Sequence, residues 1–168
     1  GDTQNGADSD DRHGPKRAVQ TGVISIKVMK KSLYVVIGLS LVSGISLLLV
    51  SFGLSGIKEF GIFFLLGVLS IGAAIKYTMG NSPYGYQGLG DVFVFLFFGL
   101  VGVVGVYFLF TQTITSEVVL VASSFGLLST GVLNINNIRD IKSDFKAGKI
   151  SIPVRLGAHY AALYHLIL

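Results

Sequence analysis

Long uncharged runs of apolar residues constrain the fold of this chain more than any other feature. Three of them, residues 32–57, 92–116 and 118–138, are long enough to cross hydrocarbon, which takes roughly 20 apolar residues. A fourth run, 60–75, is shorter and can be extended by the two interfacial residues that follow it, since a lysine stem can lie along apolar surface. The runs lack the alternation of barrel strands, so we expect four transmembrane helices.

Composition supports the same fold class. The chain is 51% hydrophobic and 13% charged, whereas soluble domains carry about 25% charged residues. The absence of cysteine excludes a disulfide scaffold and a thiolate metal site. We therefore expect an all-α, polytopic transmembrane helical bundle that is incomplete at both ends, with at least one helix before Gly1 and more after Leu168.

The charged residues predict the orientation. Four helices would place the polar segments 1–31, 76–91 and 139–157 on one side of the membrane, together with twelve of the thirteen Lys and Arg residues. The positive-inside rule makes that side cytoplasmic, and we expect a bacterial inner membrane. All seven Asp residues lie there too. Acidic residues contribute little to topology, so their one-sidedness indicates function. The net charge of +4 fits topology and anion binding; nucleic acid is not expected, because the basic segments have almost no interleaved aromatics.

The first polar segment concentrates acidic residues. Four carboxylates within ten residues are followed directly by basic side chains: Asp2, Asp8, Asp10 and Asp11, then Arg12, Lys16 and Arg17. An EF-hand is excluded because its closing Glu is missing. A solvated acidic loop remains the alternative interpretation.

The second polar segment continues a transmembrane helix. Asn136, Asp140 and Asp144 step by four residues and so share one helix face. Asn134 and Asn137 add amides near the membrane end, and polar groups at that depth usually serve a function. The alternative is a frayed helix end that reaches water.

The two segments together indicate one site. Five or more carboxylates in one cytoplasmic cavity cannot all stay ionised without cations. Oxygen ligands favour Mg²⁺ over zinc, and Mg²⁺ prefers one or two carboxylates plus substrate phosphates. Basic side chains would meet the remaining phosphate charge: Arg12, Lys16, Arg17, Arg139, Lys142 and Lys149. This pattern predicts a diphosphate bound through Mg²⁺ at the mouth of a bundle that holds a lipid tail.

These residues match a known family. The paired Asp-rich segments resemble those of the UbiA-type intramembrane prenyltransferases. Within that family the chain looks most like the 1,4-dihydroxy-2-naphthoate polyprenyltransferases, through residues 11–20, residues 136–140 with 144 and 148–157, and the loop at 77–80 and 83–91, which ends Gly-Tyr-Gln-Gly-Leu-Gly-Asp. The resemblance covers the whole chain, read as a single membrane-embedded domain, 1–168.

The resemblance implies a reaction and a set of residues. The reaction transfers a polyprenyl group from polyprenyl diphosphate to 1,4-dihydroxy-2-naphthoate with loss of CO₂, giving demethylmenaquinone in menaquinone biosynthesis. The implied metal ligands are Asp2, Asp8, Asp140 and Asp144, with Asn136 as a further catalytic residue. The implied diphosphate contacts are Arg12, Arg17, Arg139 and Lys149. Residues 76–91 would form a cytoplasmic cap loop over the site, with a plain turn as the alternative. Tyr77, Tyr86 and Asp91 are the acceptor or cap-loop residues: the two tyrosines would contact the acceptor ring or the diphosphate, and the alternative is that they are interfacial aromatics.

Three alternatives remain at this point. The first is the same chemistry on another aromatic acceptor, such as 4-hydroxybenzoate or homogentisate. Only the resemblance of the loop that ends in Asp91 favours the naphthoate over these acceptors. The CDP-alcohol phosphotransferases also use paired Asp motifs, but their Asp-Gly…Ala-Arg signature is not found in this sequence. A cation-coupled transporter would hold its carboxylates at the bilayer midplane, whereas these cluster at one mouth.

Overall fold

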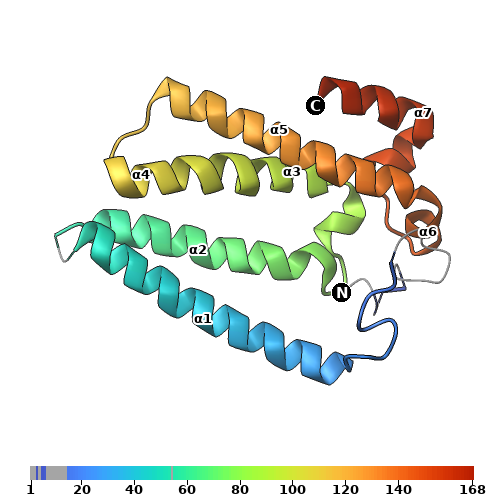
Figure 1. Cartoon of the computed structure of the whole chain (residues 1–168), viewed down its shortest axis with the longest axis horizontal. Coiled ribbons are helices and arrows are strands. Elements are labelled where there is room, and N and C mark those ends of the chain that lie inside the picture. The colour runs from blue at the N-terminus through green and yellow to red at the C-terminus, as the bar shows by residue number, and fades with distance from the viewer. Residues whose placement is uncertain (1–2, 4, 7–14, 54) are drawn as a thin grey trace. The chain divides into compact units, whose positions relative to one another are not determined.

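The computed structural model describes residues 3, 5–6, 15–53 and 55–168. Its elements are α1 (Ile26–Phe52), α2 (Ile57–Thr78), the 3₁₀ helix η1 (Tyr84–Gln87), α3 (Gly90–Val94), the π-helix η2 (Phe95–Val104), α4 (Gly105–Thr111), α5 (Ser116–Arg139), α6 (Ile141–Lys146) and α7 (Ile152–Ile167). Figure 1 shows helices joined by short connections, with no strand in the described parts of the chain. The expected all-α class is confirmed.

Four helical stretches of the described chain are long and apolar enough to cross a membrane. They are Ile26–Phe52, Ile57–Thr78, Gly90–Thr111 (α3, η2 and α4 in succession) and Ser116–Arg139. At a rise of 1.5 Å per residue the shortest, of 22 residues, extends about 33 Å, enough for a hydrocarbon core of about 30 Å. Each stretch corresponds to one of the four apolar runs predicted from the sequence.

Local sequence signals set the helix ends. The Ser25 hydroxyl accepts a hydrogen bond from the Val28 N–H at the start of α1, and the Thr115 hydroxyl does the same for Val118 at the start of α5. Both are N-caps that satisfy a backbone donor with no partner inside the helix. At the end of α1, Gly53 has a φ of 60°, and its N–H bonds the Leu49 carbonyl. This backbone conformation is accessible to glycine without a Cβ clash, so the glycine allows the chain to leave the helix here.

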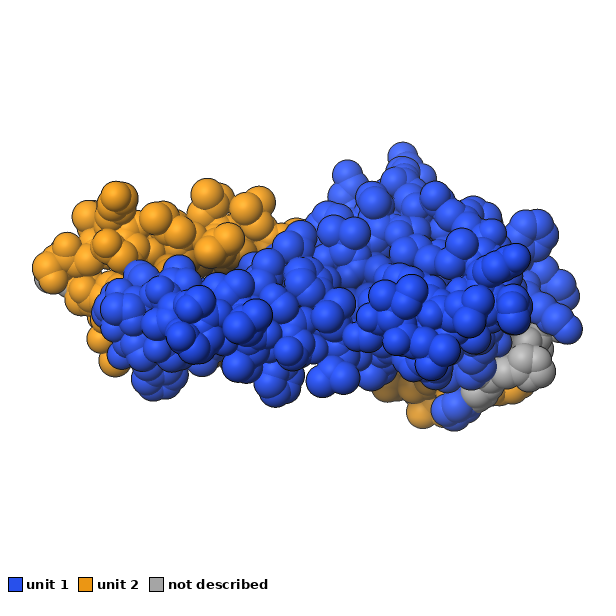
Figure 2. Space-filling view, turned by 90° about the horizontal axis from the view of Figure 1, so that it is seen from above, with its two compact units in different colours: residues 1–15, 76–168 blue, residues 16–75 orange. Residues whose placement is uncertain are grey.

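The chain divides into two compact units, shown in different colours in Figure 2. The unit of residues 16–75 holds α1 and most of α2, where the Phe52 and Phe63 rings lie 5.4 Å apart. The unit of residues 1–15 and 76–168 holds the remaining elements. Within that unit, α5 runs back along η2 after a short connection, and α7 packs against α5 (Figure 1).

Two glycines allow α5 and η2 to approach closely. A Cβ atom on Gly99 would lie 2.6 Å from the Ala122 carbonyl oxygen and 2.7 Å from the Gly126 Cα. A Cβ atom on Gly126 would lie 2.9 Å from the Phe95 carbonyl oxygen. Small residues at such crossings let helix backbones pack closely in membranes, where van der Waals contact drives helix association.

The burial pattern is inverted relative to a soluble protein. The buried hydrophobic residues of the described chain are five in number and the buried polar or charged ones are eight, among them Asp91, Asn134, Asp140 and Asp144. Large apolar side chains face outward instead, for example Val50 at 85% exposure. Outward apolar surface is stable only against lipid, and interior polar groups mark functional positions in membrane bundles. The fold is an all-α membrane bundle.

Gly157 divides α7 into two parts. Its φ of 76° and ψ of 163° are not helical, and such a conformation is accessible to glycine without a Cβ clash. The kink separates the first turn, which carries Arg155, from the part that carries Ala161 and Tyr164. Each part of α7 therefore reaches a different region of the same unit.

Candidate active site

The second Asp-rich segment begins where α5 ends. Asp140 is the C-cap of α5, with φ −97° and ψ 10°, and α6 starts at the next residue. The Asp140 N–H still bonds the Asn136 carbonyl (3.1 Å), and the Asp144 N–H bonds the Asp140 carbonyl (2.8 Å). The i,i+4 spacing of hydrogen bonds thus continues through the break. It keeps both carboxylates at the same end of α5.

Asp140 forms a two-point ion pair with its neighbour. Arg139 Nε donates to Oδ1 at 2.8 Å, and Arg139 Nη2 donates to Oδ2 at 2.7 Å. The Arg139 side chain is 38% exposed and the Asp140 side chain 11%. A bidentate guanidinium–carboxylate contact fixes orientation as well as charge. Arg139 and Asp140, predicted to bind diphosphate and metal respectively, therefore lie together.

Asp144 pairs with a second predicted cation. Lys149 Nζ lies 2.9 Å from Asp144 Oδ2, and the same ammonium donates to Asn137 Oδ1 at 3.3 Å. The side chains of Lys149 and Asp144 are 14% and 5% exposed. The backbone supports the contact, since the Lys149 N–H bonds the Asp144 carbonyl at 2.8 Å. Asp144 and Lys149 form a nearly buried pair one helical turn from Asp140.

The three asparagines of α5 occupy different environments. Asn134 is fully buried, and its Nδ2 donates to the Ala161 carbonyl of α7 at 3.2 Å. Asn137 is buried against Lys149. Asn136 is exposed and lines a pocket between α5 and α7. The shared face predicted for Asn136, Asp140 and Asp144 thus has its two carboxylates buried and its amide exposed.

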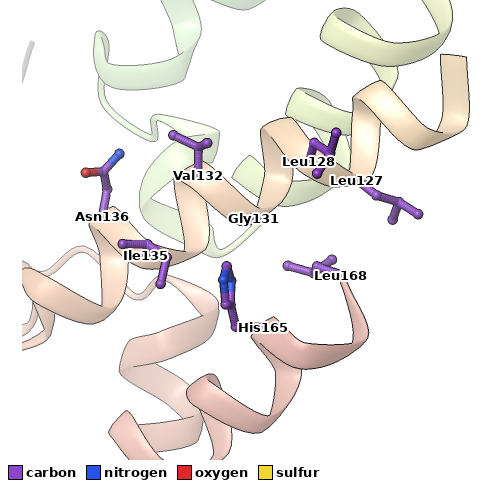
Figure 3. A pocket seen from close by; sticks show the side chains of 8 residues that line it. All are labelled: Leu127, Leu128, Gly131, Val132, Ile135, Asn136, His165 and Leu168. Carbon is purple, nitrogen blue, oxygen red and sulfur yellow. The ribbon is translucent and has the colours of Figure 1, made fainter. Parts of the chain in front are cut away.

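The pocket beside Asn136 has a volume of about 540 Å³ and mostly apolar walls. Figure 3 shows His165 of α7 pointing toward Gly131 of α5 between aliphatic side chains. A Cβ atom on Gly131 would lie 3.4 Å from the His165 ring, so the glycine lets the imidazole approach α5. Sequence reasoning assigned His165 no role.

The cap loop contacts the second Asp-rich segment directly. The Ile150 N–H donates to the Tyr86 carbonyl at 2.9 Å, and Arg155 Nη2 donates to the Gln87 carbonyl at 2.6 Å. The Tyr77 ring meets the Tyr84 ring edge-on, with centroids 5.4 Å apart, and Tyr84 stacks on Phe93 at 4.0 Å. Burial raises the pKa of Tyr84. The structure therefore brings residues 77–91 together with residues 149–155; sequence reasoning missed Tyr84 and the contact made by Arg155.

Asp91 does not lie on an open loop. It is in the first turn of α3 and is 4% exposed. The Tyr164 hydroxyl donates to its Oδ2 at 3.1 Å, and the Thr130 hydroxyl donates to its backbone carbonyl at 3.4 Å. Asp91 therefore joins α3 to α7 and α5. No signal in the sequence links Asp91 to its partner Tyr164 on α7.

The first Asp-rich segment is described only in part. Asp2, Asp8 and Arg12 lie outside the described residues. Asn5, which is described, donates from Nδ2 to the Thr78 carbonyl at 2.8 Å, next to the start of the cap loop. Arg17 belongs to the other unit, where its carbonyl accepts from the Thr21 N–H at 3.0 Å.

The donor set suits a hard divalent cation bound together with phosphates. Within residues 3, 5–6, 15–53 and 55–168, no three His, Asp or Glu side chains gather as a metal cluster would require. Asp140 and Asp144 supply two carboxylates, which is the number Mg²⁺ commonly takes from a protein when phosphate oxygens complete its shell. The positive charges of Arg139 and Lys149 lie against those two carboxylates.

Comparison with known proteins identifies the family of the chain. Residues 5–168 match the UbiA prenyltransferase family. The chain is 48% identical over its full length to the 1,4-dihydroxy-2-naphthoate octaprenyltransferase of Haemophilus influenzae and 46% identical to that of Escherichia coli, covering 54% of each. A Mycobacterium leprae protein of the same name is 37% identical over 95% of this chain and 52% of its own length.

The chain spans about half the length of the curated relatives it matches. No solved structure matches it. The family match nevertheless covers nearly the whole chain, including the buried carboxylates Asp91, Asp140 and Asp144. This chain belongs to the UbiA prenyltransferase family.

Proposed function

We propose that the whole protein transfers a polyprenyl group from polyprenyl diphosphate to 1,4-dihydroxy-2-naphthoate with loss of CO₂. The bond between the prenyl carbon and the diphosphate oxygen breaks, and its electron pair leaves with the diphosphate. A ring carbon forms the new carbon–carbon bond, and the electron pair of the broken ring–carboxylate bond stays in the ring system. The product is demethylmenaquinone in its reduced form, and no oxidant is needed.

The observation that carries this proposal is the pairing of two buried carboxylates with two cations at one end of α5. Arg139 Nη2 lies 2.7 Å from Asp140 Oδ2, and Lys149 Nζ lies 2.9 Å from Asp144 Oδ2. Such a site can exchange its internal ion pairs for contacts to a diphosphate, because guanidinium and ammonium groups bind phosphate oxygens strongly. The relatives' printed names, which specify octaprenyl transfer to the naphthoate, support the choice of substrates.

Each residue has a stated task in this proposal. Asp140 and Asp144 would hold Mg²⁺, together with Asp2 and Asp8. When bound there, Mg²⁺ would supply the positive charge that stabilises the departing diphosphate. Arg139 and Lys149 would bind the diphosphate oxygens and keep the leaving group oriented, with Arg12 as a further contact. Asn136, exposed beside the apolar pocket, would bind the metal or orient one of the carboxylates that bind it.

The membrane supplies the remaining requirement. An allylic cation is hydrolysed by water, so the reacting carbon must be kept dry. Apolar helices around the site would exclude water and hold the prenyl tail. The proposed location is the bacterial inner membrane with the site open to the cytoplasm, as the distribution of Lys and Arg indicates.

An acceptor exchange tests the function. The full-length protein would be reconstituted in lipid bilayers with Mg²⁺ and radiolabelled octaprenyl diphosphate, and offered either 1,4-dihydroxy-2-naphthoate or 4-hydroxybenzoate. We expect radiolabelled prenylated naphthol and released CO₂ only with the first acceptor. Transfer to 4-hydroxybenzoate but not to the naphthoate would refute the choice of acceptor. Transfer to neither would refute both acceptors.

A further inference from the structure

Two parts of α7 hold the two ends of one short turn. Arg155, before the kink at Gly157, donates to the Gln87 carbonyl at 2.6 Å. Tyr164, after the kink, donates to Asp91 Oδ2 at 3.1 Å. The intervening residues 88–90 therefore lie between two long-range hydrogen bonds to the same helix.

The turn also fits closely against the segment that follows Asp144. Gly88 has a φ of 78°, and a Cβ atom there would lie 3.1 Å from the Ile150 carbonyl oxygen and 3.4 Å from the Arg155 guanidinium carbon. The Ile150 N–H bonds the Tyr86 carbonyl, and Ile150 follows Lys149, the partner of Asp144. The turn is thus connected through only a few residues to the paired carboxylates.

The chemistry of the turn suits an aromatic ring better than a diphosphate. Residues 77–91 contain no Lys or Arg. Leu89 of the turn is 43% exposed, and Tyr86, the residue just before the turn, is half-buried. Arg139 and Lys149, in contrast, lie at the carboxylates. The one cation placed at the turn by these contacts, Arg155, is bound to the Gln87 carbonyl, so the turn itself contributes apolar and aromatic groups and the paired carboxylates carry the cations Arg139 and Lys149.

We propose that Arg155 is a positioning residue for the aromatic acceptor. Its hydrogen bond to the Gln87 carbonyl fixes the turn of residues 87–91 at a set distance from the Asp144–Lys149 pair. The acceptor ring is thereby held next to the prenyl carbon whose bond to the diphosphate breaks. The expected change in the KM for the acceptor rests on the proposed function. The expected change in hydrogen–deuterium exchange of the turn rests on the contacts of Arg155 alone.

The kinetic test compares Arg155→Met, which removes the donor, with Arg155→Lys, which keeps one. In the full-length enzyme, Arg155→Met should raise the KM for the naphthoate roughly tenfold while changing the KM for octaprenyl diphosphate by less than about twofold. Arg155→Lys should restore most of the acceptor KM, because an ammonium can still donate to one carbonyl. Lys58→Met, a loss of charge in the other unit, is the matched control and should leave both constants unchanged.

A second measurement does not depend on turnover. Hydrogen–deuterium exchange of the purified full-length protein should be faster in peptides covering residues 84–91 for Arg155→Met than for wild type, Arg155→Lys or Lys58→Met. Unchanged exchange in Arg155→Met would overturn the proposal, and so would an equal rise in both KM values. If the wild-type enzyme prenylates a different acceptor, the proposed function fails, and the same comparison of constants is made with that acceptor.

Discussion

The Tyr164 hydroxyl of α7 donates a 3.1 Å hydrogen bond to Oδ2 of Asp91 at the start of α3. Asp91 is 4% exposed, so this contact satisfies a carboxyl group that has little access to water. A buried polar group left without its partner destabilises the fold by more than the hydrogen bond itself contributes. The pair therefore ties the first turn of α3 to a residue of α7 that lies 73 positions further along the chain.

Tyr164→Phe should lower the free energy of unfolding by about 1 kcal/mol, as expected for one hydrogen bond inside a membrane bundle. The measurement is the thermal unfolding midpoint of the full-length protein in detergent. Asp91→Asn is the matched variant, because its amide oxygen can still accept from Tyr164, and it should shift the midpoint less. A Tyr164→Phe protein that unfolds at the wild-type temperature would show that the contact contributes nothing.

Asn134 and Asn136 offer a comparison of the same residue type on one helix. Asn134 is fully buried and bonds the Ala161 carbonyl, whereas Asn136 is exposed. Asn134→Ala should lower the free energy of unfolding by about 1–3 kcal/mol, because it removes the donor and leaves the carbonyl buried. Asn136→Ala should leave the unfolding midpoint unchanged and lower prenyl transfer. Unfolding should therefore respond to Asn134→Ala and turnover to Asn136→Ala. A destabilised Asn136→Ala protein, or an Asn134→Ala protein of wild-type stability, would contradict these roles.

The sequence was sufficient to predict the membrane-spanning helices. Apolar runs without charge can only be membrane helices, and each run matches one of the stretches in the structure. The spacing of Asp140 and Asp144 also predicted that they lie one turn apart, and the backbone hydrogen bond between them agrees.

Other features depend on partners distant in sequence. A Gly-rich loop ending in Asp91 is typical of an exposed cap, and only the fold supplies Tyr164 and Thr130 to bury that carboxyl group. Arg155 donates to the backbone carbonyl of Gln87. Every residue has such a carbonyl, so the residue types do not indicate which one is the acceptor. Long-range contacts of this kind have no local pattern from which they could be predicted.

Gly99 tests the close packing of η2 on α5. In Gly99→Ala the new Cβ would lie 2.6 Å from the Ala122 carbonyl oxygen and 2.7 Å from the Gly126 Cα. Both neighbours are backbone atoms, so the helices must separate, and we expect a loss of about 1–3 kcal/mol in the free energy of unfolding. Gly44→Ala is the control, since its Cβ would meet no atom of the described residues within 4 Å. Equal unfolding midpoints for the two variants in detergent would contradict the close contact.

The carboxylate pair gives the test of metal dependence. Asp140→Asn and Asp144→Asn keep the shape and the hydrogen-bonding oxygen of each side chain but remove the negative charge that would bind Mg²⁺. Each variant should lower turnover of the full-length enzyme by at least about 100-fold, the scale on which loss of charge stabilisation at a leaving group acts. Chelation with EDTA should stop wild-type turnover, and added Mg²⁺ should restore it. Glu117→Gln, at the opposite end of α5, is the charge-matched control and should retain wild-type rates. Wild-type rates from either Asp variant, or full activity in EDTA, would refute the metal role of the pair.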